Sequence, residues 1–203
     1  MRALIIVDVQ NDFLPGGALA VRAGDEIIGP INRIQQKFDL ILATQDWHPA
    51  DHQSFAANHA GTKPGDMVTL NGLPQVLWPV HCVQRTHGAE LAAALQKYRF
   101  ARIFLKGTHA DVDSYSGFYD NGRTHSTGMA EFLHQRGVYE VCVCGLATDY
   151  CVKFTALDAA REEFRTSVLA DACRGVELNP GDVQRALDEL RTAGVAIRIT
   201  DQV

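Results

Sequence analysis

The stretch YEVCVCGLATDYCV, residues 139–152, combines an apolar run, a tight turn and the expected start of a helix. Cys142 and Cys144 alternate with valines in the apolar run, which has the length of a strand and ends at Gly145. The turn then leads to Cys151, where a helix is predicted over 151–164. A buried strand followed directly by a helix is the repeating unit of parallel sheets, so this stretch favours an α/β fold.

The same unit recurs along the chain. The alternation predicts a single domain over 1–203, with a six-stranded, mostly parallel sheet and helices on both faces in a Rossmann-like three-layer arrangement. The expected strands are 3–9, 39–45, 101–106, 139–145, 166–171 and 195–200, and the expected helices are 25–38, 88–98, 126–136, 151–164 and 182–192.

Composition narrows the class of protein. Charged residues make up 21% and hydrophobic residues 46%, which is ordinary for a globular protein. With 19 Lys and Arg against 24 Asp and Glu and no basic run, nucleic-acid binding is not expected. Asp8 interrupts the apolar N-terminus too early for a signal peptide or a membrane span, so no membrane association is expected. The odd number of cysteines, 5, without a C-x-x-C pair, predicts reduced thiols in the cytoplasm.

Reactive side chains follow four of the predicted strands. Asp8 closes the first, Asp46 follows the second, Lys106 closes the third, and the turn GLATDY after the fourth leads to Cys151. Ligands of open parallel sheets bind at the carboxyl ends of the strands. We therefore expect these four side chains at one edge of the sheet.

Each of these residues has a structural alternative when taken alone. Cys151 is expected at a helix start, where the helix dipole and a nearby Lys106 would favour the thiolate, but small core cysteines also occur there. Asp8 and Lys106 taken singly are structural more often than catalytic. Their convergence favours chemistry, whereas Cys142 and Cys144 lie on one face of a strand and are expected to be packing residues.

Two long polar connections, 46–86 and 107–125, are typical of functional loops. In the first, Asp46, His48 and His81 offer a carboxylate and two imidazoles, a set that suits a divalent transition metal. Such spacing also arises by chance in a chain with 8 histidines. Competing candidates in the same region are His52, His59 and His87.

Five motifs in order then resemble a known family. They are IIVDVQNDF (5–13), TQDWHP (44–49), WPVHC (78–82), LKGT (105–108) and GLATDYCV (145–152). Together they resemble the isochorismatase-like cysteine hydrolases, and within that family the bacterial nicotinamidases. The resemblance extends from residue 3 to about 175, and the ordered set is far more specific than any one motif.

The resemblance implies an activity and the residues that perform it. A triad of Asp8, Lys106 and Cys151 would hydrolyse nicotinamide to nicotinate and ammonia through a thioester, and pyrazinamide is a plausible further substrate. Backbone N–H groups of Ala147 and Cys151 would bind the oxyanion. The family also has a cis peptide bond that maps to Leu146–Ala147 and would aim the Ala147 N–H at the oxyanion.

The resemblance also implies a cofactor. One divalent transition metal would be held by Asp46, His48 and His81, with zinc expected first and iron or manganese as alternatives. His52 is a ligand in some relatives only, so its contribution is left open.

Aromatic side chains on the three loops of this edge are expected to hold the pyridine ring. These are Phe13, Trp78 and Tyr115, with Phe118 as a weaker candidate. Local packing within the loops is the alternative for each.

Three other functions compete with this interpretation. A metal-free amidase or ureido hydrolase of the same family would have no need for Asp46, His48 and His81 together. An isochorismatase proper lacks the cysteine that Cys151 supplies, and a pure binding module has no use for the complete triad. The metal and the oligomeric state, a homo-oligomer included, are left open by the sequence.

Overall fold

A computed structural model describes residues 1–203. Six strands form one sheet in the order β5-β2-β1-β6-β7-β8, and every pairing is parallel. From the central β1 the chain moves outward through β2 and β5, then returns and moves the other way through β6, β7 and β8. The switch point therefore lies between β1 and β6. The strands are β1 Arg2–Val7, β2 Leu40–Asp46, β5 Phe100–Lys106, β6 Glu140–Leu146, β7 Arg165–Arg174 and β8 Ala196–Arg198.

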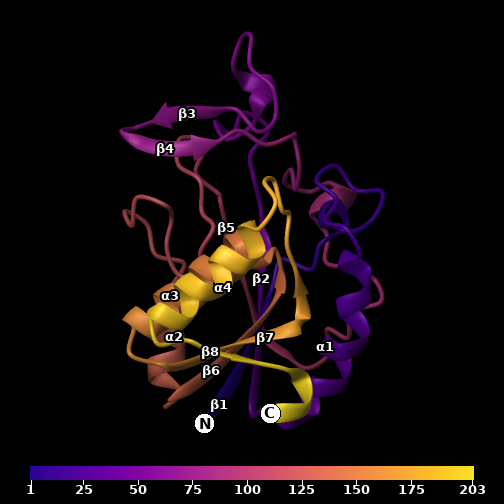
Figure 1. Ribbon diagram of the computed structural model, residues 1–203, viewed down its shortest axis with the longest axis vertical. Coiled ribbons are helices and arrows are strands. Elements are labelled where there is room, and N and C mark those ends of the chain that lie inside the picture. The colour runs from indigo at the N-terminus through magenta and orange to yellow at the C-terminus, as the bar shows by residue number, and fades with distance from the viewer.

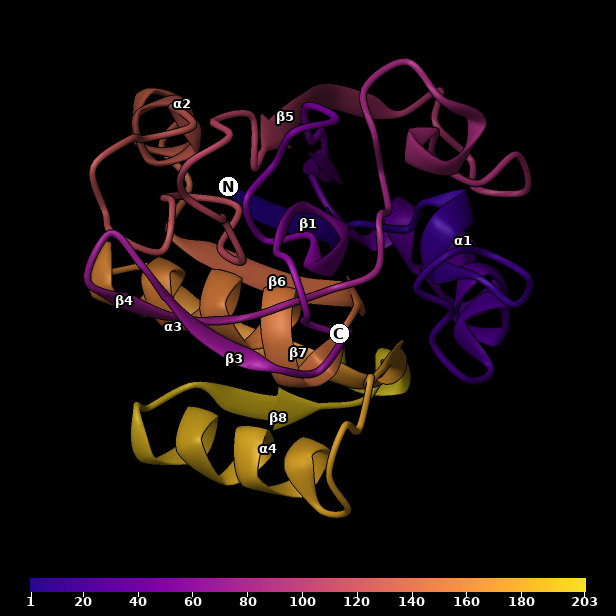
Figure 2. The ribbon, with the colours of Figure 1, turned by 90° about the horizontal axis from the view of Figure 1, so that it is seen from above.

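Helices cover both faces of this sheet. Figure 2 shows α2, α3 and α4 along one face and α1 on the other. The predicted fold class is therefore confirmed. The helices are α1 Ile28–Ile34, α2 Met129–Gln135, α3 Lys153–Arg161 and α4 Asp182–Thr192, and short 3₁₀ turns extend α1 to 24–37. None of them has the length and apolar character required to cross a bilayer.

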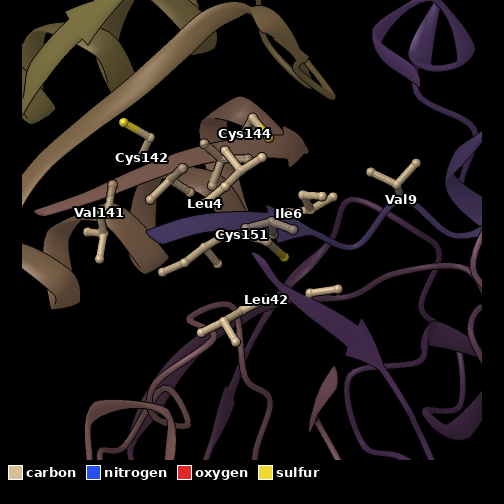
Figure 3. Close-up of a cluster of buried hydrophobic side chains, with 14 of the residues drawn as sticks. Leu4, Ile6, Val9, Leu42, Val141, Cys142, Cys144 and Cys151 are labelled. Atoms are coloured by element: carbon tan, nitrogen blue, oxygen red, sulfur yellow. The ribbon is translucent and has the colours of Figure 1, made fainter. Parts of the chain in front are cut away.

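The two central strands form the middle of the core. Every residue of β6 is buried, and β1 is buried from Ala3 onward. Such nearly continuous apolar strands are typical of a sheet covered on both faces. Figure 3 shows Cys142 and Cys144 among these side chains, near Leu4.

The predicted helix over 88–98 is wrong. Only a 3₁₀ turn, His87–Ala89, forms there, and the chain then runs extended beside the segment after β1. Ala92 N–H donates to Val9 O at 2.9 Å, and Asn11 N–H donates to Glu90 O at 3.0 Å. Pairing with a distant segment therefore overrides the local helical pattern, while Leu91, Ala92 and Leu95 still become buried.

The long connection after β2 contains a hairpin that the sequence analysis did not predict. Strands β3, Met67–Leu70, and β4, Leu73–Val76, pair antiparallel around Asn71 and Gly72. An Asn-Gly pair between two short strands is a strong hairpin signal, and both residues have positive φ, 49° and 82°. Figure 1 places this hairpin at the opposite end of the molecule from both termini.

Candidate active site

Four predicted side chains meet at the carboxyl edge of the sheet. Asp8 directly follows β1, Asp46 and Lys106 are the last residues of β2 and β5, and Cys151 lies beyond β6. All four are buried, with exposed fractions between 0% and 7%. Strand ends at the switch point therefore bring together residues that are up to 143 positions apart in the chain.

Lys106 is the centre of this group. Its Nζ lies 2.8 Å from Asp8 Oδ2 and 2.5 Å from Asp46 Oδ1, and it donates to Ser114 O at 2.9 Å. These three acceptors match the three N–H donors of an ammonium group. Cys151 Sγ is a fourth, more distant neighbour at 3.4 Å. Burial alone would lower the pKa of Lys106, but the two carboxylates raise it well above its usual value, so the side chain is a fixed cation.

The two carboxylates of this group differ in their acidity. Burial raises the pKa of Asp8 to about 6, and the charge of Lys106 only partly opposes the effect. For Asp46, burial is outweighed by Lys106 and His48, whose charges hold the pKa well below its usual value. Thr44 Oγ1 donates to Asp8 Oδ1 at 2.6 Å and fixes the orientation of that carboxylate. Of the two carboxylates, Asp8 thus has the pKa closer to neutral pH.

Cys151 is a protonated thiol in this environment. Burial raises its pKa well above the usual value, and Lys106 lowers it only in part. Cys151 also lies inside a π-helical turn, Thr148–Val152, and not at the first residue of α3. This turn leads directly into α3, so Cys151 lies in the first turns of a helix as predicted, but burial opposes the thiolate that the helix start and Lys106 favour. Since ligand atoms of Asp8, Asp46 and Cys151 lie within 4.8 Å of one another, a carboxylate is close enough to take the thiol proton.

The turn before Cys151 presents an unused backbone donor. The peptide bond Leu146–Ala147 is cis, as the resemblance implied. Ala147 O accepts from Tyr150 N–H and Val152 N–H, both at 3.1 Å, whereas the Ala147 N–H has no acceptor within the protein. This N–H lies on a residue that lines the same pocket as Cys151, so it can meet an oxygen of a bound ligand.

Asp46, His48 and His81 form a group that could hold a metal ion. Asp46 Oδ2 lies 3.6 Å from His48 Nε2 and 3.9 Å from His81 Nε2. The other ring nitrogens are occupied, since His48 Nδ1 lies 2.9 Å from Gly107 O and His81 Nδ1 lies 2.8 Å from Pro79 O. A carbonyl can only accept, so both Nδ1 atoms carry a proton and both Nε2 atoms lie on the side of Asp46.

The residues around Asp46, His48 and His81 also fit a metal site. Gly107 has φ +62°, and a Cβ there would lie 2.3 Å from His48 Cε1, so only glycine fits beside this imidazole. His52 packs 4.2 Å from His48 between ring centroids, and its buried Nε2 has no hydrogen-bond partner. An unpaired buried nitrogen beside one of the three possible ligand residues fits a cation site. The residues present therefore fit a divalent metal.

A narrow pocket lies in front of these groups. The three predicted aromatic residues, Phe13, Trp78 and Tyr115, all line it, together with Cys151. Phe118 does not line it and is fully buried in the core near Phe164. Four further residues line the pocket that were not predicted from the sequence, and these are Leu19, Asp113, Tyr150 and Val176.

The turn GLATDY positions two of these residues, Val176 through the Asp149 carboxylate and Tyr150 directly. Asp149 accepts from Val176 N–H at 2.9 Å and from Glu177 N–H at 2.8 Å, which fixes the loop after β7 against the pocket. Tyr150 follows directly and packs edge-on against Trp78 at 4.9 Å between ring centroids. The GLATDY motif was the available signal for Tyr150, which directly precedes Cys151, whereas no sequence motif marks Val176.

Two of the competing histidines and both strand cysteines lie elsewhere. His59 Nε2 bonds Gln53 O at 2.8 Å, and His87 is an exposed partner of Glu90. Cys142 and Cys144 are fully buried, and Figure 3 shows them apart from Cys151, whose sulfur lies near β1 and β2. Cys142 and Cys144 are therefore packing residues, and none of the cysteines forms a disulfide.

On a doubly wound sheet, a thiol in contact with a lysine and a carboxylate at the switch point is typical of hydrolases with a cysteine nucleophile. The protein can be placed more closely than this class. It belongs to the isochorismatase family, because the family described as "Isochorismatase domain" matches residues 2–202.

Similar proteins extend this assignment. The chain is 49% identical over 193 residues to a nicotinamidase of Acinetobacter baylyi, covering 95% of this chain and 90% of that relative. A solved nicotinamidase and pyrazinamidase of Acinetobacter baumanii superposes with a TM-score of 0.97 at 45% identity, covering 99% of this chain and 97% of the other. A pyrazinamidase of Pyrococcus horikoshii, solved in complex with zinc, has a TM-score of 0.80 at 40% identity and covers 98% of both chains.

Proposed function

We propose that the protein is a nicotinamidase, which hydrolyses the carboxamide of nicotinamide to nicotinate and ammonia. The observation that carries the proposal is the contact of Lys106 with both Asp8 and Cys151, since Cys151 also lines a narrow aromatic pocket. Nicotinamidases at nearly half identity over almost the full chain support the choice of substrate.

The first half-reaction would form a thioester. Asp8, ionised above a pKa of about 6, takes the proton of the Cys151 thiol as the sulfur attacks the carbonyl carbon. Lys106 stabilises the thiolate during this transfer, and the N–H groups of Ala147 and Cys151 bind the oxyanion, worth about 3 kcal/mol for each donor. When the C–N bond breaks, the protonated Asp8 returns its proton to the leaving nitrogen, and ammonia departs.

The second half-reaction would release the acid. Water attacks the thioester carbonyl and gives a proton to Asp8, which is again ionised. The C–S bond then breaks, the sulfur recovers the proton from Asp8, and nicotinic acid leaves and loses its carboxyl proton to water as nicotinate. The raised pKa of Asp8 suits this double role, because a group that titrates near neutral pH both accepts and donates protons readily.

Asp46, His48 and His81 would hold one divalent transition metal ion, which when bound supplies a Lewis-acid position on the wall of the pocket. Zinc is proposed because two imidazole nitrogens and a carboxylate are common ligands of catalytic zinc, and the Pyrococcus horikoshii relative was solved with zinc. Iron or manganese are the alternatives for the same donors.

The loss of a metal-ligating side chain should lower metal affinity, which can be measured without an activity assay. His81→Ala removes one imidazole without touching Lys106, and metal affinity should fall at least about tenfold by chelator competition. His59→Ala, in the same connection but outside the group, should retain its metal. Elemental analysis of the purified wild-type protein identifies the ion, and an unchanged affinity in His81→Ala would remove His81 from the ligand set.

Ammonia release tests the reaction itself. Wild type with restored metal should release ammonia from nicotinamide, and Cys151→Ala should lower the rate by at least about a thousandfold. Cys144→Ala is the matched control, because it also removes a buried thiol but lies outside the pocket. If wild type releases no ammonia the proposed function is wrong, and equal rates in wild type and Cys151→Ala would exclude Cys151 from the mechanism.

Pyrazinamide is the second substrate to measure. It is also a carboxamide on a single flat six-membered ring, and the Acinetobacter baumanii relative is named for both activities. The narrow pocket sets no evident distinction between the two rings.

A further inference from the structure

Tyr150 separates the pocket from a second, larger cavity. The pocket in front of Cys151 has a volume of about 30 Å³. Behind Tyr150 lies a groove of about 230 Å³ between the β3–β4 hairpin and α3. Tyr115 and Tyr150 line both cavities and are the partition between them. The groove's other lining residues are Met67, Pro74, Val76, Asp149, Lys153, Phe154 and Asp182.

The two tyrosines of this partition are held differently. The hydroxyl of Tyr115 lies 3.3 Å from Trp78 Nε1 and 3.1 Å from Gln75 Nε2, and its ring stacks on Phe154 at 5.4 Å. Tyr150 has only edge-on ring contacts, at 4.9 Å to Trp78 and 5.4 Å to Tyr115, and its hydroxyl has no partner within the protein. Tyr115 is therefore fixed by polar bonds, whereas Tyr150 closes the pocket by its bulk.

We propose that Tyr150 is the specificity-determining residue that restricts this enzyme to amides of a single ring. The inference rests on the proposed function. Truncation of Tyr150 at Cβ would join the pocket to the groove, where Phe154, Val76 and Pro74 offer an apolar surface to a second aromatic ring. The chemical class admitted by the opened site would be bicyclic aromatic carboxamides.

The test compares substrates that differ by one fused ring. Quinoline-3-carboxamide and isoquinoline-4-carboxamide carry that ring on two different edges of the pyridine of nicotinamide. In Tyr150→Ala, kcat/KM for at least one of them, relative to nicotinamide, should rise at least about tenfold over wild type. Tyr150→Phe keeps the bulk and should keep the wild-type ratio. Met67→Ala enlarges the groove without opening the partition, and its ratio should also be that of wild type.

Several outcomes would overturn the inference. One is a wild type whose kcat/KM for either bicyclic amide equals that for nicotinamide. Another is a Tyr150→Ala variant whose kcat/KM for both bicyclic amides, relative to nicotinamide, is that of wild type. The third is an equal rise of this relative kcat/KM in Met67→Ala. Tyr150→Leu opens the partition less and should change the ratio in the same direction, which serves if Tyr150→Ala fails to fold.

Binding measurements separate this inference from the proposed function. In a Cys151→Ala background, calorimetry should give at least about a tenfold lower Kd for one bicyclic amide when Tyr150→Ala is added. If wild type does not hydrolyse nicotinamide, the proposed function fails, and the Kd comparison still decides the role of Tyr150. An unchanged Kd for both bicyclic amides would refute that role.

Discussion

Charged groups gather at both ends of the same sheet, and the two groups differ in their access to water. At the carboxyl edge, the side chains of Asp8 and Lys106 are 0% exposed and that of Asp46 is 6% exposed. At the amino edge, Glu140 is also buried, but its partners Arg2, Arg165 and Arg198 are 29%, 69% and 28% exposed. The distances from their guanidinium groups to Glu140 are 3.3, 3.6 and 3.9 Å.

The difference follows from the loops. Long connections after β1, β2 and β5 cover the carboxyl edge, whereas the amino edge is left open to solvent around its arginines. Burial raises the pKa of Asp8 at this edge, with Lys106 opposing and Asp46 adding to the effect, and two carboxylates against one ammonium suit a further cation at Asp46. The excess positive charge around Glu140 is solvated, so it lowers the free energy of unfolding only slightly. Similar ion pairs are thus reactive at one edge and structural at the other.

Removal of the buried Lys106 cation should have the largest effect on stability and turnover. Lys106→Met leaves Asp8 and Asp46 without their partner, and the free energy of unfolding should fall by about 3 to 5 kcal/mol. Turnover of nicotinamide should be lost with it. Arg198→Met is the matched control at the amino edge and should cost less than about 1 kcal/mol, by urea unfolding of both variants. Equal losses in the two variants would contradict the distinction between the edges.

The next effect concerns the proton carrier. Asp8→Asn should lower kcat/KM for nicotinamide at least about a hundredfold, because the amide cannot accept the thiol proton. In wild type, kcat/KM should decline as the pH falls below about 6, where Asp8 becomes protonated. Glu140→Gln should keep both the rate and the pH profile of wild type. A wild-type rate that stays constant from pH 7 to 5 would exclude Asp8 as the base.

The same carboxylate predicts a smaller effect on stability. The pKa of Asp8 is raised from 3.8 when unfolded to about 6 when folded, so its stabilising contribution is present below pH 4 and is lost as the pH rises through 6. Two pKa units correspond to about 3 kcal/mol at most. Unfolding of wild type and Asp8→Asn should therefore be compared at pH 4 and pH 6.5. The stability of wild type relative to the variant should decrease across this interval, and an increase would reverse the assigned sign.

The sequence predicts the charged residues at the strand ends better than the residues that line the pocket. Asp8, Asp46 and Lys106 could be placed because strand ends of a parallel sheet share one edge, whatever the intervening loops do. The helix over 88–98 failed because its backbone pairs with the segment after β1, which no local pattern records. Tyr150 lines the pocket because its ring packs against Trp78, and Val176 does so because its N–H donates to Asp149. Both contacts join segments that are distant in the sequence, so no local pattern predicts them. The β3–β4 hairpin was readable from Asn71-Gly72 and was missed.

The smallest effect is expected at the amino edge. Arg165 lies 3.6 Å from Glu140 with 69% of its side chain exposed, so water already solvates most of its charge. Arg165→Ala should change the free energy of unfolding by less than about 1 kcal/mol, and the change should shrink as salt is raised. Its kcat/KM should equal that of wild type, because Glu140 lies at the far end of β6 from Cys151. A loss above about 2 kcal/mol, or a changed pH profile, would mean that the two edges are coupled through the sheet, and burial alone would then not explain why only one of them is reactive.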